Sequence, residues 1–251
     1  MVNRRTVIAA AAALPLFTLT GGQILAQDSS ALSGDSVATA EGDIIVHPVQ
    51  HASLVIGFGA QVIYVDPVGG AEAYQGLPAP TAILITHGHG DHFDVPTLEA
   101  IAGAAPILTN QDVFDKLPAA LKGNAAAIAN GADTELAGIP VRAIGAYNLT
   151  AERLQYHPKG VGNGYVLTLG DKLVYIAGDT EPTPDMLGLK NIELAFVPMN
   201  LPYTMTQEQA AEAVNTFAPR IVYPYHYSGD DLAVFVGAVG TQSEVRRGKW
   251  Y

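Results

Sequence analysis

The chain has 251 residues, of which 49% are apolar and only 15% charged, so it is long enough for one packed globular domain and too apolar to be disordered. Its formal net charge of −11 argues against a nucleic-acid partner, because binding phosphates requires a basic surface. The chain has no cysteine, which excludes disulfides and thiolate ligands. Any bound metal must therefore be held by histidine, aspartate or glutamate.

The N-terminal segment has the features of an export signal. Paired arginines at 4 and 5 precede an alanine-rich apolar stretch, and Ala26 supplies a small residue for cleavage. We predict an export signal over 1–26 that resembles the twin-arginine type, with an ordinary secretory signal as the alternative. We expect a flexible lead-in over 27–42, a folded domain over 43–251, and a periplasmic or otherwise exported protein. No later stretch offers about 20 uninterrupted apolar residues, so no membrane anchor is expected after cleavage.

The first half of the domain alternates short apolar runs with helical patterns. Asp94 is placed to cap the helix that begins at Val95, and Gly59 marks a hairpin turn. The run at 82–86 is short and wholly apolar before Thr86, as in a strand buried on both faces. The other expected elements are strands at 44–47, 53–58, 61–66, 106–109 and 125–129, and a helix over 111–121.

The second half repeats this order of elements at a constant offset of 111 residues, as from Gly59 to Gly170. The offset carries the hairpin, the following buried strand and the next helix onto later counterparts. That later helix begins with a capping box, Thr206 to Gln209. We predict an α/β domain built from two similar halves, each a sheet with helices on its outer side, packed sheet on sheet. The loops that follow the equivalent strands would then meet at one edge.

Four residues that can bind metal come immediately after the buried strand, in Thr86-His87-Gly88-His89-Gly90-Asp91-His92. The two glycines let His87 and His89 converge on one cation, while Asp91 and His92 face a neighbouring position. Imidazole nitrogen and carboxylate oxygen suit zinc, with manganese or iron as alternatives. A polar loop with solvated histidines is the other interpretation.

Further candidates lie at the ends of predicted strands. Asp179 and His226 each follow an apolar strand, and His157 precedes one. Their alternatives are a turn cap, a buried structural histidine and an exposed loop histidine, respectively. His51 and Asp66 are candidates for orienting the ligands rather than for binding metal. The alternative for His51 is a packed strand histidine. Weaker candidates for substrate contact are Tyr147, Asn148, Asn200, Tyr203 and Tyr227.

This constellation resembles the metallo-β-lactamase-fold hydrolases, and more narrowly the branch that contains L-ascorbate-6-phosphate lactonase. The narrower likeness lies in His51-Ala52-Ser53, Asp66-Pro67, Tyr147-Asn148, His157-Pro158-Lys159-Gly160, Ala177-Gly178-Asp179-Thr180, Thr204-Met205-Thr206 and His226-Tyr227. The resemblance implies a four-layer αββα sandwich. It also implies the ligand sets: His87, His89 and His157 for a first metal, Asp91, His92 and His226 for a second, and Asp179 bridging both.

The predicted activity is therefore hydrolysis by an exported dinuclear enzyme. Two divalent cations about 3.5–4 Å apart would share a water and lower its pKa toward about 7, and the resulting hydroxide would attack a lactone, phosphoester or related ester of a small molecule. Asp91 would orient that hydroxide as well as bind metal. The alternatives are a β-lactamase acting on antibiotics, disfavoured by the lack of a cysteine ligand and of a lysine after 196–198, and a non-catalytic metal-binding module. A nuclease is disfavoured by the acidity and the export signal.

Overall fold

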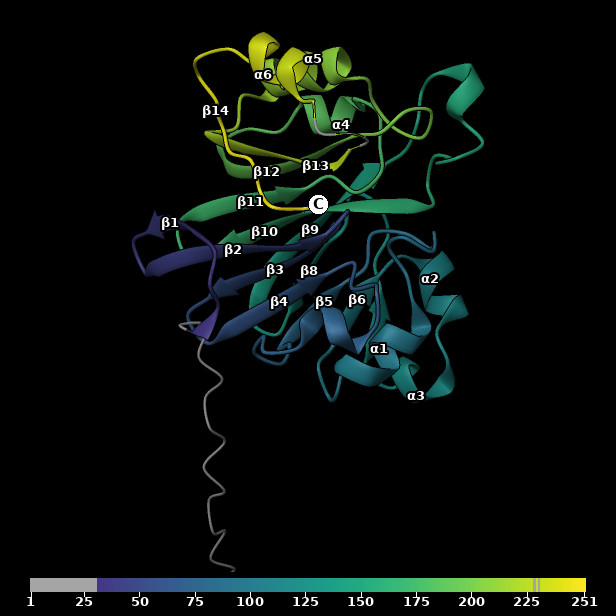
Figure 1. The fold of residues 1–251 in the computed structure, drawn as a ribbon. Helices are drawn as coiled ribbons and strands as arrows, with labels where there is room; N and C mark the ends of the chain where they lie inside the picture. Colours follow the sequence, from purple (N-terminus) through teal and green to yellow (C-terminus); the bar gives the residue numbers. More distant parts are fainter. Residues whose placement is uncertain (1–30, 228, 230) are drawn as a thin grey trace, which may run out of the picture.

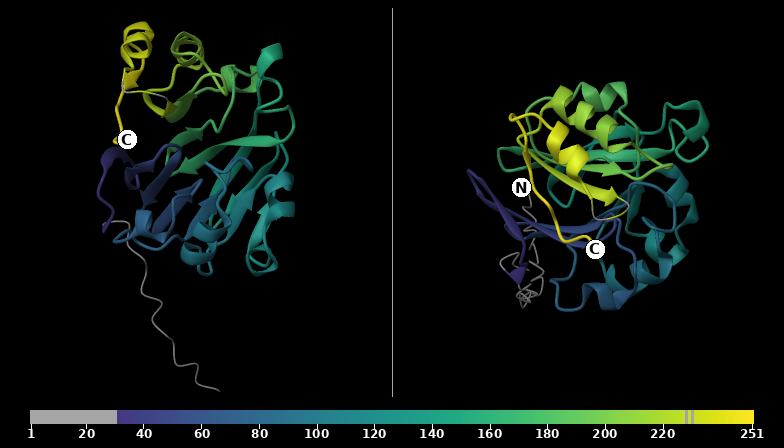
Figure 2. Two further views of the ribbon diagram at one scale, coloured as in Figure 1. Left: turned by 45° about the vertical axis from the view of Figure 1, so that its right-hand side comes forward. Right: turned by 45° about the horizontal axis from the view of Figure 1, so that its top comes forward.

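The computed structural model describes residues 31–227, 229 and 231–251. Two sheets face each other at the centre, and helices cover the outer side of each sheet, as Figures 1 and 2 show. The export signal predicted over 1–26 lies outside the described residues. Within the part of the chain that is described, no helix is long and apolar enough to cross a membrane.

The first sheet has seven strands in sequence order, antiparallel from β1 to β4 and parallel from β4 to β7. These strands are β1 (Asp35–Thr39), β2 (Gly42–Gln50), β3 (Ser53–Phe58), β4 (Gln61–Val65), β5 (Ala82–Leu84), β6 (Ile107–Thr109) and β7 (Ala125–Ala127).

The second sheet has the same pattern, antiparallel from β8 to β11 and parallel from β11 to β14. Its strands are β8 (Asp133–Leu136), β9 (Ile139–Ala146), β10 (Gly162–Leu169), β11 (Lys172–Ile176), β12 (Ile192–Met199), β13 (Ile221–Tyr227) and β14 (Glu244–Val245). The identical order of strand pairings confirms the predicted αββα fold and its two similar halves.

The helices begin where the sequence supplies caps. Asp94 accepts a hydrogen bond from the backbone N–H of Thr97 at the start of α1. Thr206 and Gln209 form the predicted capping box of α5, with both reciprocal hydrogen bonds present. The helices are α1 (Val95–Ile101), α2 (Gln111–Lys116), α3 (Ala119–Lys122), α4 (Pro184–Leu187), α5 (Gln207–Phe217) and α6 (Ala233–Ala238), with short 3₁₀ turns η2 (Ala71–Tyr74) and η3 (Ala151–Arg153).

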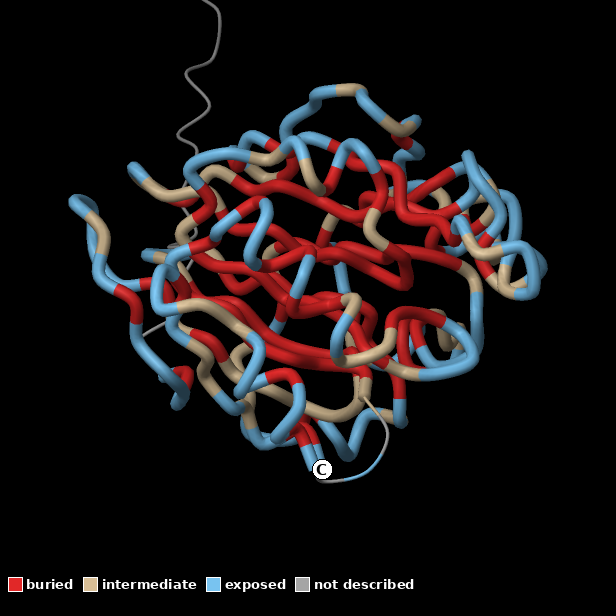
Figure 3. Tube along the Cα trace, turned by 90° about the horizontal axis from the view of Figure 1, so that it is seen from above, coloured by how far each residue is buried: buried red, intermediate tan, exposed pale blue. Residues whose placement is uncertain are grey.

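Three apolar clusters hold the layers together. The central cluster joins the inner faces of the two sheets, with Leu54 and Ile56 from the first and Leu167 and Phe196 from the second. A second cluster packs α4, α5 and α6 onto the second sheet, and a third packs α1, α2 and α3 onto the first. Figure 3 shows the result as buried strands through the middle of the molecule and exposed loops around it.

Two expectations about local structure were wrong. The lead-in predicted as flexible over 27–42 contains β1, whose residues pair with β2 from Asp35↔Val46 to Thr39↔Gly42. The single helix predicted over 111–121 is divided into α2 and α3, because Leu117 adopts an extended conformation before Pro118. Both differences lie outside the loop that carries the histidine motif.

Candidate metal centre

The candidate metal ligands lie at one edge of the two sheets, brought there by four separate segments. The loop after β5 supplies His87, His89, Asp91 and His92, and the loops after β9 and β11 supply His157 and Asp179. His226 lies within β13, one residue before its end. All seven predicted metal ligands therefore converge, although 139 positions separate the first from the last.

The first group of ligands consists of His87, His89, His157 and Asp179, whose donor atoms all lie within 4.8 Å of one another. His87 Nε2 is 3.1 Å from His89 Nδ1, and Asp179 Oδ2 is 3.2 Å from His157 Nε2. Except for His89, the group is buried. This is the ligand set that the resemblance implies for the first metal, together with the bridging aspartate.

The second group consists of His92, Asp179 and His226, also within 4.8 Å. His92 Nε2 is 3.3 Å from Asp179 Oδ1, and His226 Nε2 is 3.3 Å from Asp179 Oδ2. Asp91 adjoins this group, with Oδ2 at 3.3 Å from His226 Nε2 and 4.0 Å from His92 Nε2. Asp179 thus contacts both groups, as a bridging ligand would.

Several histidines are oriented in the same way: Nδ1 lies at hydrogen-bond distance from an acceptor, and Nε2 points into the centre. His92 Nδ1 lies 2.7 Å from Asp66 Oδ2, and His157 Nδ1 lies 3.0 Å from the carbonyl oxygen of Tyr203. His87 Nδ1 lies 3.0 Å from Thr86 Oγ1, whose own proton goes to Asp66. Each contact engages Nδ1 and leaves Nε2 as the nitrogen that faces the centre, which is the orientation a metal ligand needs.

Four buried atoms at the centre have no hydrogen-bond partner among the described residues: His92 Nε2, His157 Nε2, His226 Nε2 and Asp179 Oδ1. Leaving a buried polar atom unpaired costs free energy, so four in one place require an explanation. Cations would satisfy all four, and a set of imidazole nitrogens and carboxylate oxygens suits zinc, manganese or iron. The residues therefore fit bound metal.

The electrostatics of the centre follow from burial and from close contact between opposite charges. Burial and the neighbouring His92 hold the pKa of His87 well below its ordinary value, and burial and His157 lower that of His89. Burial alone would raise the pKa of Asp179, but His226 and His92 outweigh it and hold that pKa well below its usual range. His87 and His89 are consequently neutral, and Asp179 is ionised, at neutral pH.

Asp66 and Thr86 form a buried support beneath the histidine loop. Asp66 accepts hydrogen bonds from the backbone N–H and the hydroxyl of Thr86, both at 2.7 Å, as well as contacting His92. Because the Thr86 N–H bonds to the Asp66 side chain, β5 ends at Leu84 and not at Thr86 as predicted. Thr86 was not singled out from the sequence, since a threonine at a strand end has no distinguishing pattern.

A second support, missed from the sequence, holds the loop that carries His157. The buried Glu181 accepts hydrogen bonds from the N–H groups of Leu149 and Thr150, both at 2.6 Å, and pairs with Arg153 at 2.7 Å. Burial raises the pKa of Glu181, but these donors, led by Thr150, lower it overall. Its position two residues after Asp179 was the only signal in the sequence.

The residues expected to contact substrate are placed unequally. Tyr147 and Asn148 are buried, and the Asn148 amide donates to the carbonyl oxygens of Tyr203 and Arg153 at 2.6 and 3.1 Å. Tyr203 is half-exposed and packs edge-on against Tyr156. Asn200 and Tyr227 are partly buried, and His51 lies at the centre itself, with Nε2 3.3 Å from Asp91 Oδ2.

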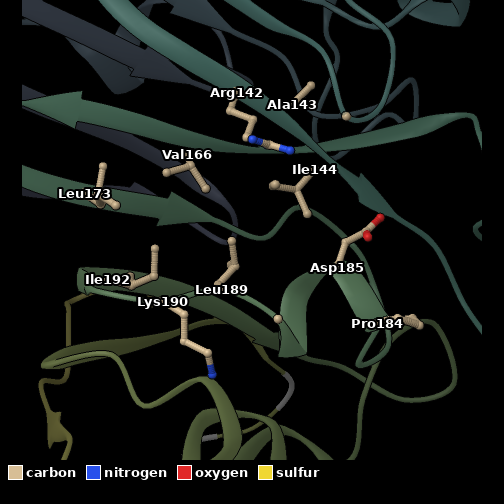
Figure 4. A pocket seen from close by; sticks show the side chains of 12 residues that line it. Arg142, Ala143, Ile144, Val166, Leu173, Pro184, Asp185, Leu189, Lys190 and Ile192 are labelled. Atoms are coloured by element: carbon tan, nitrogen blue, oxygen red, sulfur yellow. The ribbon is translucent and has the colours of Figure 1, made fainter.

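A cavity of about 240 Å³ adjoins the first group of ligands and is lined by His87, His89, His157, Lys116 and Tyr156 among others. A larger cavity of about 480 Å³ lies away from the centre, between α4 and the second sheet, as Figure 4 shows. Arg142, Asp185 and Lys190 are among its lining residues, and none of the seven metal-ligand candidates lines it. Only the smaller cavity is placed for substrate.

Comparison with known proteins gives a consistent family. Residues 58–227 match the family model described as a beta-lactamase superfamily domain. A UPF0173 metal-dependent hydrolase of Methylobacterium nodulans is 33% identical over 195 residues, covering 70% of this chain and 82% of that protein. The solved structure of a proposed metal-dependent hydrolase from Parabacteroides distasonis is similar, with a TM-score of 0.80 and 37% identity over 87% of this chain and 99% of that one.

The metallo-beta-lactamase fold protein YhfI from Bacillus subtilis shares the fold, with a TM-score of 0.64, 16% identity and coverage of 81% of this chain and 91% of that one. The family match spans the histidine loop, His157, Asp179 and His226. These likenesses confirm the predicted superfamily and enzyme class. The chain belongs to the metallo-β-lactamase superfamily and is a metal-dependent hydrolase of that fold.

Proposed function

We propose that this protein is an exported dinuclear hydrolase that cleaves a lactone, a phosphoester or a related ester bond in a small molecule. The observation that carries the proposal is the position of Asp179. One of its oxygens faces His92 Nε2 at 3.3 Å, and the other faces His157 Nε2 at 3.2 Å and His226 Nε2 at 3.3 Å. A carboxylate shared by two sets of nitrogen donors is the arrangement that two adjacent cations require.

Two bound cations, zinc or alternatively manganese or iron, supply an acidified water and a polarised electrophile. Asp91 is the residue of this chain best placed to handle the proton. Its side chain is 47% exposed, whereas Asp179 is buried. Burial raises the pKa of Asp91, but contacts with His226 and His51 outweigh it and hold the pKa well below its usual range. Because Asp91 stays ionised, it would accept a hydrogen bond from the attacking water and orient it toward the electrophile.

The small cavity beside the first group of ligands suits the non-reacting part of a substrate. At about 240 Å³ it is smaller than the roughly 300–1,000 Å³ of typical drug-sized sites. His89 and His157 form part of its lining, and Tyr156 and the ion pair between Lys116 and Asp112 supply further polar groups. A small polar molecule fits these properties, and the chain's charge of −11 disfavours a nucleic acid.

The test is a screen of the metal-loaded protein against lactones, phosphodiesters, phosphomonoesters and a chromogenic β-lactam. We expect hydrolysis of a lactone or phosphoester, abolished by chelation, with kcat lowered about 10²–10⁴-fold in Asp91→Asn. Turnover of the β-lactam alone would favour the antibiotic-hydrolysing alternative. A protein carrying two metals but inactive on the whole panel would overturn the proposed reaction.

Export is tested separately, because it rests on residues 1–26. We expect the mature protein in the periplasmic fraction of a bacterial host, and its retention in the cytoplasm when Arg4 and Arg5 are both replaced by lysine. Continued export of the double-lysine variant would indicate an ordinary secretory signal. A protein found only in the cytoplasm with its N-terminus intact would contradict export.

A further inference from the structure

His51 lies against the second group of ligands, held there by its own backbone. It occupies the turn between β2 and β3 with a φ of 48°, in the left-handed region that few residues other than glycine, asparagine and aspartate adopt. Its carbonyl oxygen accepts a hydrogen bond from the N–H of His226 at 3.0 Å, and its N–H donates to the carbonyl of Trp250 at 3.3 Å. The His51 and His226 rings lie 4.0 Å apart. The backbone of His51 is thus fixed from two sides.

The hydroxyl of Tyr251 determines which nitrogen of His51 carries the proton. That hydroxyl lies 2.6 Å from the carbonyl oxygen of Tyr227, which can only accept, so the phenolic proton is directed there. Tyr251 Oη must then accept from His51 Nδ1, which lies 2.7 Å away. The neutral imidazole therefore carries its proton on Nδ1 and a lone pair on Nε2. Trp250, which is buried, anchors the segment that presents Tyr251.

This is the device already described for His87, His92 and His157, in which Nδ1 is tied to an acceptor and Nε2 is left as a donor to metal. The Nε2 lone pair of His51 faces a carboxylate oxygen, Asp91 Oδ2, at 3.3 Å. His226 Nε2 lies 3.3 Å from the same oxygen, and the donor atoms of His51, Asp91 and His226 all lie within 4.8 Å of one another. Three donors converging in this way call for a cation among them.

We propose that His51 is a further ligand of the second cation, with Tyr251 as the residue that positions it. This inference rests on the dinuclear centre of the proposed function and adds one nitrogen donor to its second position. The side chains of His51 and Asp91 are 27% and 47% exposed, so these two donors lie on the solvent side of the second group, beside the buried His226.

The experiment is a titration of the full metal-stripped chain with Co²⁺, followed by visible absorption and by calorimetry. The test variant is His51→Asn, because asparagine tolerates the left-handed backbone and its short side chain does not reach the position of Nε2. Tyr251→Phe removes the acceptor for His51 Nδ1, together with the hydrogen bond that the hydroxyl donates to the carbonyl of Tyr227. The control is His47→Asn, four residues earlier in strand β2, where His47 Nδ1 contacts the carbonyl of Ser33 and not the centre.

Wild type and His47→Asn should each bind two equivalents of Co²⁺. His51→Asn should keep the first and bind the second at least tenfold more weakly, with a changed absorption band, and Tyr251→Phe should weaken the second by about tenfold. A second equivalent bound by His51→Asn with wild-type affinity and spectrum would show that His51 only pairs with Asp91, and would overturn the proposal.

Failure of the proposed function gives a different pattern. A wild-type chain that binds a single equivalent overturns the dinuclear centre and this inference together. Two equivalents, with the second sensitive to His51→Asn, support the inference even where the substrate panel gives no turnover. Should His51→Asn fail to fold, as judged by circular dichroism of the metal-free protein, Tyr251→Phe decides, since it leaves the His51 ring and backbone in place.

Discussion

The Thr86 hydroxyl is important for the geometry of the centre, because its oxygen contacts Asp66 and two candidate ligands, His87 and His92. Thr86 is fully buried, and its hydroxyl donates to Asp66 Oδ2 at 2.7 Å and lies 3.0 Å from His87 Nδ1. Thr86→Val preserves shape and removes these contacts. Losing a hydrogen bond to a charged acceptor costs about 1.5–3 kcal/mol, which lowers the melting temperature of a domain this size by about 3–12 °C. Metal affinity should fall about 10–100-fold, because the His87 ring loses its orienting partner.

Thr109→Val is the matched control. Thr109 is equally buried and donates its hydroxyl to the carbonyl of Ile85 at 3.1 Å, away from the ligands. It should lose about 0.5–1.5 kcal/mol and keep wild-type metal affinity. The assay is denaturant unfolding of the metal-free proteins, with zinc titration of each. Equal metal affinity in Thr86→Val, Thr109→Val and wild type would refute the claim that Thr86 orients His87.

Three further outcomes are expected. Glu181→Gln should destabilise the protein at pH 7 and destabilise it less at pH 3.5. A carboxyl whose pKa is lowered on folding stabilises fully above its unfolded pKa and loses this contribution as the pH falls through its folded pKa. Equal losses in unfolding free energy at both pH values would contradict this. Lys116→Met should raise KM for anionic substrates more than it lowers kcat, whereas Lys122→Met, at a partly buried lysine outside the cavity, should change neither. The steady-state kinetics of both variants decide. Removing metal with a chelator should lower the melting temperature. Restoring zinc at 100 times its Kd should raise the free energy of unfolding by about 2.7 kcal/mol per site, and a melting temperature that does not change with metal would contradict binding at this centre.

The fold and the convergence of the candidate ligands could be predicted because both follow from local patterns. The offset between Gly59 and Gly170 marks two equivalent hairpins, and the identical strand pairings follow from that duplication. The candidate ligands lie where buried strands end, so the residues after β5 and β11 are recognisable in the sequence as polar groups that interrupt apolar runs. Polar residues that gather at strand ends can therefore be identified from a single sequence.

Edge strands and supporting contacts could not be predicted in this way. Within β1 only Val37 is buried, so its sequence lacks the apolar alternation that marks a half-buried strand, and pairing with β2 supplies its order. β8 likewise buries only Leu136. The contact of Tyr251 with His51 joins residues 200 positions apart, and that of Glu181 with Leu149 joins residues 32 apart. Such pairs arise from the closed fold and leave no local signal.

The central claim is that Asp179 holds two cations at once, and the metal content of the purified protein tests it most directly. Elemental analysis after zinc or manganese loading should give two equivalents per wild-type chain. Asp179→Ala should lose affinity for both, because its carboxylate contacts both groups of ligands. A wild-type chain that neither carries nor takes up metal, or an Asp179→Ala variant that retains two equivalents, would contradict the dinuclear centre.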